Sequence, residues 1–74
     1  MDYVDKLTGL REDRDLKQST IAKLLNTNQS TISKYELKKR KYQVEDIMKL
    51  CLFYNVSADW LLGLPDGLPY PKRK

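Results

Sequence analysis

The chain of 74 residues contains no histidine, one cysteine, three glycines and three prolines. A lone cysteine excludes a disulfide within the chain, and without histidine we expect no metal site and no other cofactor. No apolar run approaches the roughly 20 residues of a membrane span, and the N-terminal region is too charged for a signal peptide. We therefore expect a soluble, cytoplasmic protein that makes no membrane contact.

Catalytic groups are also scarce. The sequence has no nucleophile–base pair and no glycine-rich phosphate loop, so we expect neither an enzyme nor a small-molecule substrate. Cys51 falls on the apolar face of an expected helix, which indicates a core residue rather than a redox sensor.

Positive charge is in excess, with 14 lysines and arginines against 10 acidic residues and a net charge of +4. Residues 38–41 form one basic block, and residues 72–74 form a second at the end of the chain. The excess favours a polyanionic partner. A short basic run alone is equally compatible with an ordinary solvated loop.

Apolar spacing predicts an all-α fold with five helices, over residues 4–13, 18–25, 29–37, 44–54 and 58–62. Asp2, Asn28 and Ser57 are suited to cap the first, third and fifth, and Gly63 to end the last. Only about three residues separate the second and third helices, which is typical of a helix-turn-helix connection.

The periodicity also predicts which side chains are buried. In the third helix these are Ile32 and Tyr35. In the fourth they are Val44, Ile47, Met48, Leu50 and Cys51, with Tyr54 as a further candidate. Trp60 has two interpretations, closure of the core or contact with a second subunit, and the nearby Leu61, Leu62, Leu64 and Leu68 exceed what a small core needs.

The stretch NTNQSTISKYE, residues 26–36, carries six uncharged polar side chains where a surface helix usually carries Glu and Lys. Gln29, Ser30, Ser33 and Lys34 share one face of the expected third helix. Gln, Ser and Lys can hydrogen-bond to base edges in the major groove, whereas a purely charged face would contact phosphates without reading sequence. We interpret this face as base-reading; the alternative is that these are simply polar residues at a helix start.

Residues 16–36, LKQSTIAKLLNTNQSTISKYE, resemble the helix-turn-helix of the phage repressor and Cro family, also called the XRE family. Residues 55–63, NVSADWLLG, resemble the end of the same domain. The resemblance implies a five-helix, lambda-repressor-like DNA-binding domain whose second and third helices form the helix-turn-helix, as in phage or prophage regulators. It covers nearly the whole chain.

The resemblance also implies roles for individual positions. Arg11 and Glu36 match a pair that joins the first helix to the third. The base-reading positions are Gln29, Ser30, Ser33 and Lys34, and the phosphate-binding positions are Gln18, Asn28, Thr31, Lys38, Lys39, Arg40 and Lys41. Relatives usually have glycine where Asp15, Asn26 and Lys38 stand, and often proline at Tyr42, so the loops are expected to differ most.

We therefore expect residues 1–64 to form a helix-turn-helix domain and residues 65–74 a proline-rich basic segment, either a linker or a tail on DNA phosphates. The expected function is sequence-specific binding of double-stranded DNA by a transcriptional regulator, a repressor acting as a homodimer on a near-palindromic operator. Trp60, Leu61 and Leu64 are the candidate dimer contacts. The alternative is a protein-interaction module, antitoxin-like or adaptor, that uses the surface around Trp60.

Overall fold

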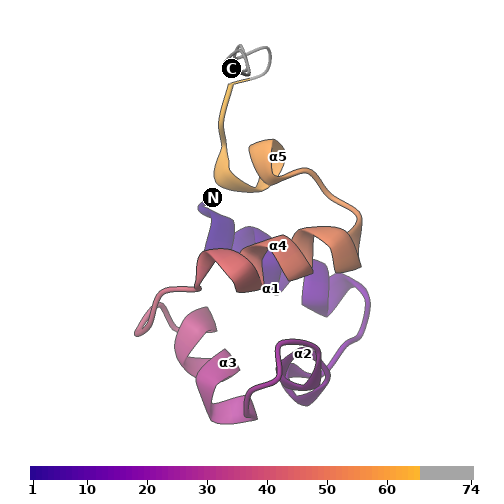
Figure 1. The fold of residues 1–74 in the computed structure, drawn as a ribbon, viewed down its shortest axis with the longest axis vertical. Helices are drawn as coiled ribbons and strands as arrows, with labels where there is room; N and C mark the ends of the chain where they lie inside the picture. Colours follow the sequence, from indigo (N-terminus) through magenta and orange to yellow (C-terminus); the bar gives the residue numbers. More distant parts are fainter. Residues whose placement is uncertain (66–74) are drawn as a thin grey trace, which may run out of the picture.

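The computed structural model describes residues 1–65, which form five helices and no strand (Figure 1). They are α1 (Tyr3–Asp13), α2 (Gln18–Leu24), α3 (Gln29–Glu36), α4 (Val44–Tyr54) and α5 (Ala58–Leu62). The all-α, five-helix prediction is confirmed, with every boundary within one residue. None of these helices is both long and apolar enough to cross a membrane. Apart from Pro65, the segment expected at 65–74 lies outside the described residues.

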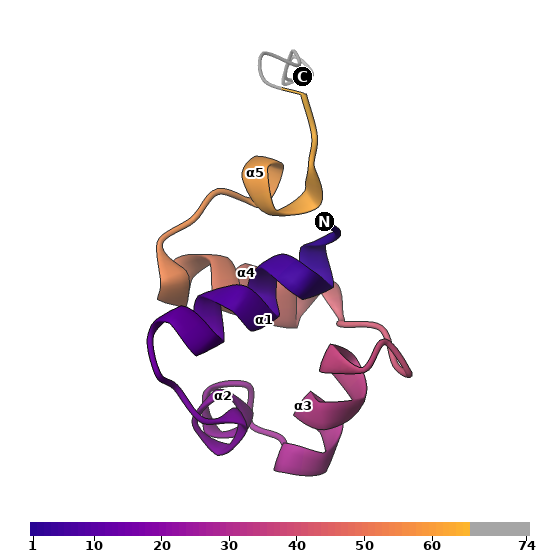
Figure 2. The same cartoon turned by 180° about the vertical axis from the view of Figure 1, so that it is seen from behind.

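The helices are arranged in tiers along the long axis of the molecule. α2 and α3 lie at one end, α5 lies toward the other, and α1 and α4 run across the axis between them (Figure 1). α4 is in front of α1 in this view and behind it in the opposite view (Figure 2). The helix-turn-helix pair therefore occupies one end of the molecule, and one long side of α4 faces outward.

One cluster of buried side chains joins all five helices. Its members are Val4, Leu7, Ile21, Ala22, Leu25, Ile32, Tyr35, Tyr42, Leu50, Cys51, Tyr54 and Leu61. Burial raises the pKa of the Cys51 thiol, as expected for a cysteine that packs rather than reacts.

Tyr42, at a position where relatives often have proline, is part of this core. Its ring stacks on Tyr35 with centroids 4.3 Å apart and meets the edge of Tyr3 at 6.2 Å. Burial raises the pKa of the Tyr42 hydroxyl, so the side chain stays neutral. The residue directly after the basic block thus anchors that block between α1 and α3.

Two assignments made from periodicity were wrong. Val44 and Met48 of α4 are largely exposed, because this helix turns Leu50, Cys51 and Tyr54 toward the core instead. Trp60 is 49% exposed and does not close the core. Leu61 does, with no exposed surface, so it has nothing to offer a second subunit.

Every helix is followed by a residue with positive φ, four of them not glycine: Asp15, Asn26, Lys38, Asn55 and Gly63. The next amide then donates to the carbonyl five residues earlier, as Thr27 N does to Ala22 O at 2.8 Å. This is the Schellman arrangement. Asp15, Asn26 and Lys38 are the positions at which relatives usually have glycine, and Asn55 is a further non-glycine residue with positive φ.

The left-handed turn between α2 and α3 should tolerate Asn26 far better than a β-branched residue, which rarely adopts positive φ. We expect Asn26→Val to lower the free energy of unfolding by about 1–2 kcal/mol, and Asn26→Gly to preserve it. Urea denaturation would measure both. Thr27→Val is the matched control, since Thr27 lacks a positive φ; an equal loss in this control would contradict the explanation.

Candidate nucleic-acid interface

The turn before α3 orients its first residues. Asn28 caps the helix, its Oδ1 accepting hydrogen bonds from the Thr31 backbone N–H at 2.9 Å and from Thr31 Oγ1 at 3.0 Å. Ile32 and Tyr35 point into the core on the opposite side. The α3 start is thereby held with its polar side outward.

The four residues expected to read bases lie on that outward side. Gln29, Ser30 and Lys34 are exposed, and Ser33 is partly buried. At helical spacing the four occupy one arc of the helix surface. They present amide, hydroxyl and ammonium groups, which can donate or accept hydrogen bonds in a groove.

A polar network fixes α3 against α1 and α2. The Arg11 guanidinium donates to the Glu36 carboxylate twice, from Nε to Oε2 at 2.7 Å and from Nη2 to Oε1 at 3.0 Å. Gln18 Nε2 donates to Glu36 Oε1 at 2.9 Å, and Arg11 Nη1 donates to the Leu16 carbonyl at 2.9 Å. The pair is mostly removed from solvent, and the Glu36 carboxylate raises the pKa of Arg11. This network links the start of α2 to the end of α3.

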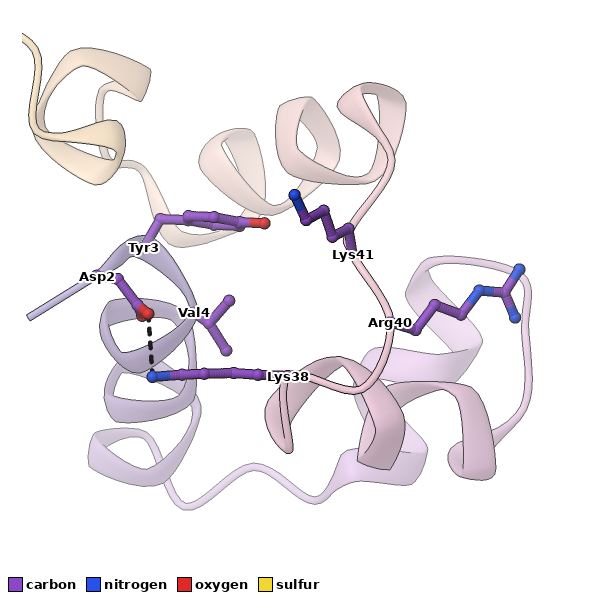
Figure 3. A pocket seen from close by; sticks show the side chains of 6 residues that line it. All are labelled: Asp2, Tyr3, Val4, Lys38, Arg40 and Lys41. Atoms are coloured by element: carbon purple, nitrogen blue, oxygen red, sulfur yellow. Dashed lines mark ion pairs between the residues drawn. The ribbon is translucent and has the colours of Figure 1, made fainter.

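The basic block after α3 is attached to the start of α1. Lys38 Nζ lies 3.0 Å from Asp2 Oδ2, an ion pair drawn in Figure 3. It also lies 3.2 Å from Asp5 Oδ1. These two carboxylates raise the pKa of the Lys38 ammonium. The pKa of the Asp2 carboxyl is lowered, mainly by the hydrogen bond that it accepts from the Asp5 backbone N–H and next by Lys38. With Lys38 at one end and Tyr42 at the other, both ends of the block contact the fold.

The remaining basic side chains of the block are exposed. Arg40 extends away from the hollow that the block forms with α1, while Lys41 extends toward Tyr3 (Figure 3). Lys39, Arg40 and Lys41 are therefore accessible cations on the loop that leaves α3.

Four residues expected at phosphates have intramolecular partners, and two of them, Asn28 and Thr31, hydrogen-bond to each other. Gln18 gives one amide N–H to Glu36, and Lys38 gives its ammonium to Asp2 and Asp5. The part played by Asp2, Asp5 and Tyr42 in holding the loop was missed. The contacts of Lys38 with Asp5 and of Tyr42 with Tyr3 join residues more than thirty positions apart. The local spacing of residues in the sequence therefore does not indicate them.

Trp60 stands away from this site. Lys6 Nζ lies 5.0 Å from the centre of the Trp60 ring and donates to the Trp60 carbonyl at 2.7 Å.

No group of three His, Cys, Asp or Glu side chains within residues 1–65 is placed to hold a metal ion.

A tight turn joins α2 to α3, and α3 packs against α2 with its polar side outward. This is the arrangement of a helix-turn-helix domain. The chain belongs to the helix-turn-helix family, whose profile matches residues 9–61. The resemblance to phage repressor-type domains is thereby confirmed, as is the lambda-repressor-like fold.

Three similar proteins set this in context. An uncharacterized HTH-type transcriptional regulator of Bacillus subtilis (strain 168), YobD, is 31% identical over 70 residues, covering 95% of this chain and 62% of that protein. A transcriptional regulator from Listeria innocua has a TM-score of 0.80 at 26% identity, over 95% of this chain and 65% of its own. The P22 c2 repressor, solved with synthetic operator 9T, has a TM-score of 0.74 at 18% identity, over 88% of this chain and 98% of its own. The chain thus spans less than two thirds of the first two relatives.

Removing the Glu36 carboxylate should leave the Arg11 charge unpaired in a mostly buried site. We expect Glu36→Leu to lower the free energy of unfolding by about 3 kcal/mol, measured by chemical denaturation. Adding Arg11→Met to Glu36→Leu should recover most of the loss, because no buried charge then remains. The exposed Glu45→Leu is the control, expected to change stability by less than about 0.5 kcal/mol. A double variant no more stable than Glu36→Leu would refute this account.

Proposed function

We propose that this chain binds double-stranded DNA with sequence preference, as the DNA-binding unit of a transcriptional regulator. The observation that carries the proposal is the outward polar arc of α3, held in one orientation by the Arg11–Glu36–Gln18 network. A helix presented in this way fits the major groove, where its first residues meet base edges. Amide and hydroxyl groups suit that role because they both donate and accept.

The basic loop supports the same proposal. Lys39, Arg40 and Lys41 are exposed beside the end of α3, where phosphates would flank a helix lying in the groove. Asn28, Thr31 and the second amide N–H of Gln18 are further phosphate candidates at the other edge. Lys38 acts differently in this proposal: it positions the loop through Asp2 and Asp5.

The similar proteins support a function in DNA binding and transcription regulation. Two are described as transcriptional regulators, and the P22 c2 repressor was solved with operator DNA. We extend this to the present chain as a cytoplasmic, non-enzymatic repressor that occludes a promoter as a homodimer on a near-palindromic operator. The competing protein-interaction module would not require the α3 arc, so loss of function from α3 variants separates the two.

Selection of binding sites from random duplex DNA, at near-physiological salt, tests the proposal directly. We expect enrichment of a two-fold-symmetric motif with half-site centres about 34 Å apart, one turn of B-DNA. Salt-sensitive binding without any enriched motif would mean that only phosphates are contacted. Absence of binding would favour the protein-interaction module.

Gln29, in the first turn of α3, should contribute to the choice of one base pair. We expect Gln29→Ala to weaken binding to the selected site by about 1–3 kcal/mol and to relax preference at one position. Repeating the selection with the variant measures both effects. Gln43→Ala, which removes an exposed glutamine outside α3, is the control. An unchanged motif in Gln29→Ala would show that the base-reading face lies elsewhere.

Lys39 should contribute affinity without specificity. We expect Lys39→Ala to weaken binding to all sequences alike and to reduce the slope of log K against log salt by about one unit. Titrations over a series of salt concentrations give this slope. Lys49→Ala is the control, since it removes an exposed lysine from another helix, α4. Its binding is measured on a duplex with a single half-site, where we expect the affinity and the salt slope of the native chain. A loss confined to the selected site would instead make Lys39 a base-reading residue.

A further inference from the structure

The outward side of α4 carries an apolar stripe that has no function in the site described above. Val44, Met48 and Leu52 are 68%, 60% and 81% exposed. Their spacing of four residues places them along one side of the helix, over about 12 Å. Three large exposed apolar side chains in a row on one helix of a small chain mark a candidate contact surface.

We propose that this α4 stripe, Val44–Met48–Leu52, is where a second copy of the chain docks, with the two α4 helices antiparallel about a two-fold axis. The inference deepens the proposed function and rests on it, because it names the surface that joins two DNA-binding units. Met48 of each copy would lie at the axis, and Val44 of one copy would face Leu52 of the other.

The stripe is suited to self-pairing in its symmetry and in its charges. Met48 stands midway between Val44 and Leu52, so reversing one helix superimposes the stripe on itself. Glu45 and Lys49 flank it on the same helix, and neither forms an ion pair within residues 1–65. In an antiparallel pair, Glu45 of one copy approaches Lys49 of the other, twice by symmetry.

The orientation of α4 in the fold also allows the α3 helices of both copies to face the same duplex. The helix runs across the long axis of the molecule, and α2 and α3 lie at one end of that axis (Figure 1). A two-fold axis parallel to the long axis therefore reverses α4 and keeps both α3 helices at the same end. Two recognition helices on one side of a duplex need this arrangement.

The extent of the stripe bounds the strength of the dimer. A stable interface buries about 800 Å² per partner, contributed by 20 or more residues on each side. Three apolar side chains and their charged neighbours fall well below this. The two copies should therefore associate weakly alone and pair firmly when adjacent half-sites hold them together, which raises their effective concentration.

The α5 end of the molecule is the competing dimer surface. Leu61 is buried there, and the Trp60 ring is already in contact with Lys6. Trp60, Leu62 and Leu64 are 49%, 45% and 48% exposed and are the residues through which that surface would act. Substitutions at Met48 and Leu64 therefore distinguish the two.

The test uses opposite charges at Met48. On duplex DNA with two half-sites, Met48→Glu and Met48→Lys should each lose about tenfold or more in affinity, while binding a single half-site like the native chain. An equal mixture of the two variants should restore binding, since Glu then faces Lys across the axis. Leu64→Glu should bind both duplexes like the native chain. Loss in Leu64→Glu alone, or no rescue in the mixture, would overturn the assignment.

A readout without DNA separates failure of this inference from failure of the proposed function. In a Cys51→Ala background, Met48→Cys should form a disulfide-linked dimer under mild oxidation at high protein concentration, and Leu64→Cys should not. Cross-linking without DNA binding would leave the α4 contact standing and refute the proposed function. Selective DNA binding without cross-linking at Met48, and without any effect of the charged variants, would refute the contact alone.

Discussion

The Glu36 carboxylate is the group on which the rest of this structure depends. It sits on the last turn of α3 and accepts hydrogen bonds from Arg11 of α1 and Gln18 of α2. Ala22 of α2 and Ile32 of α3 also belong to the buried core. Apolar contacts tolerate sliding, whereas a bidentate guanidinium–carboxylate pair allows one geometry. A mostly buried ion pair adds little net stability compared with apolar side chains of similar size. Its value here is the single orientation it imposes on the helix that carries the polar arc.

The connections between helices impose the second constraint. Each turns through a left-handed residue, and at Asp15, Asn26, Lys38 and Asn55 that residue is not glycine. A left-handed backbone costs most non-glycine residues about 1–3 kcal/mol, and Asn and Asp less, so a residue such as Lys38 keeps it only where surrounding contacts hold it. At Lys38 those contacts are visible: its ammonium reaches Asp2 and Asp5, and Tyr42 closes the loop by packing on Tyr35. The loop after α3 is thus held by contacts with both α1 and α3.

Much of the fold follows from local pattern, and the exceptions have a common cause. Caps at Asp2, Asn28 and Ser57 set the helix starts, since each side chain accepts from an amide three residues later. The buried face of α3 follows equally well, since Ile32 and Tyr35 both lie in the core. α4 was misjudged because apolar residues surround more than half of it, so periodicity finds the helix but does not decide which apolar side meets the core. For the candidate site, the polar arc is a property of α3 alone. The partners of Gln18 and Lys38 depend on how distant segments pack.

The apolar excess on α4 has a consequence for regulation if the helix serves two surfaces. Leu50, Cys51 and Tyr54 pack in the core of the chain, whereas Val44, Met48 and Leu52 are exposed and form the contact that we propose for a second copy. A tight dimer would occupy DNA in proportion to its concentration. A weak pair assembles on the operator, so occupancy rises with roughly the square of the monomer concentration. The limited area of the stripe then becomes useful, because it makes binding respond steeply to protein level while each unit stays folded through its own core.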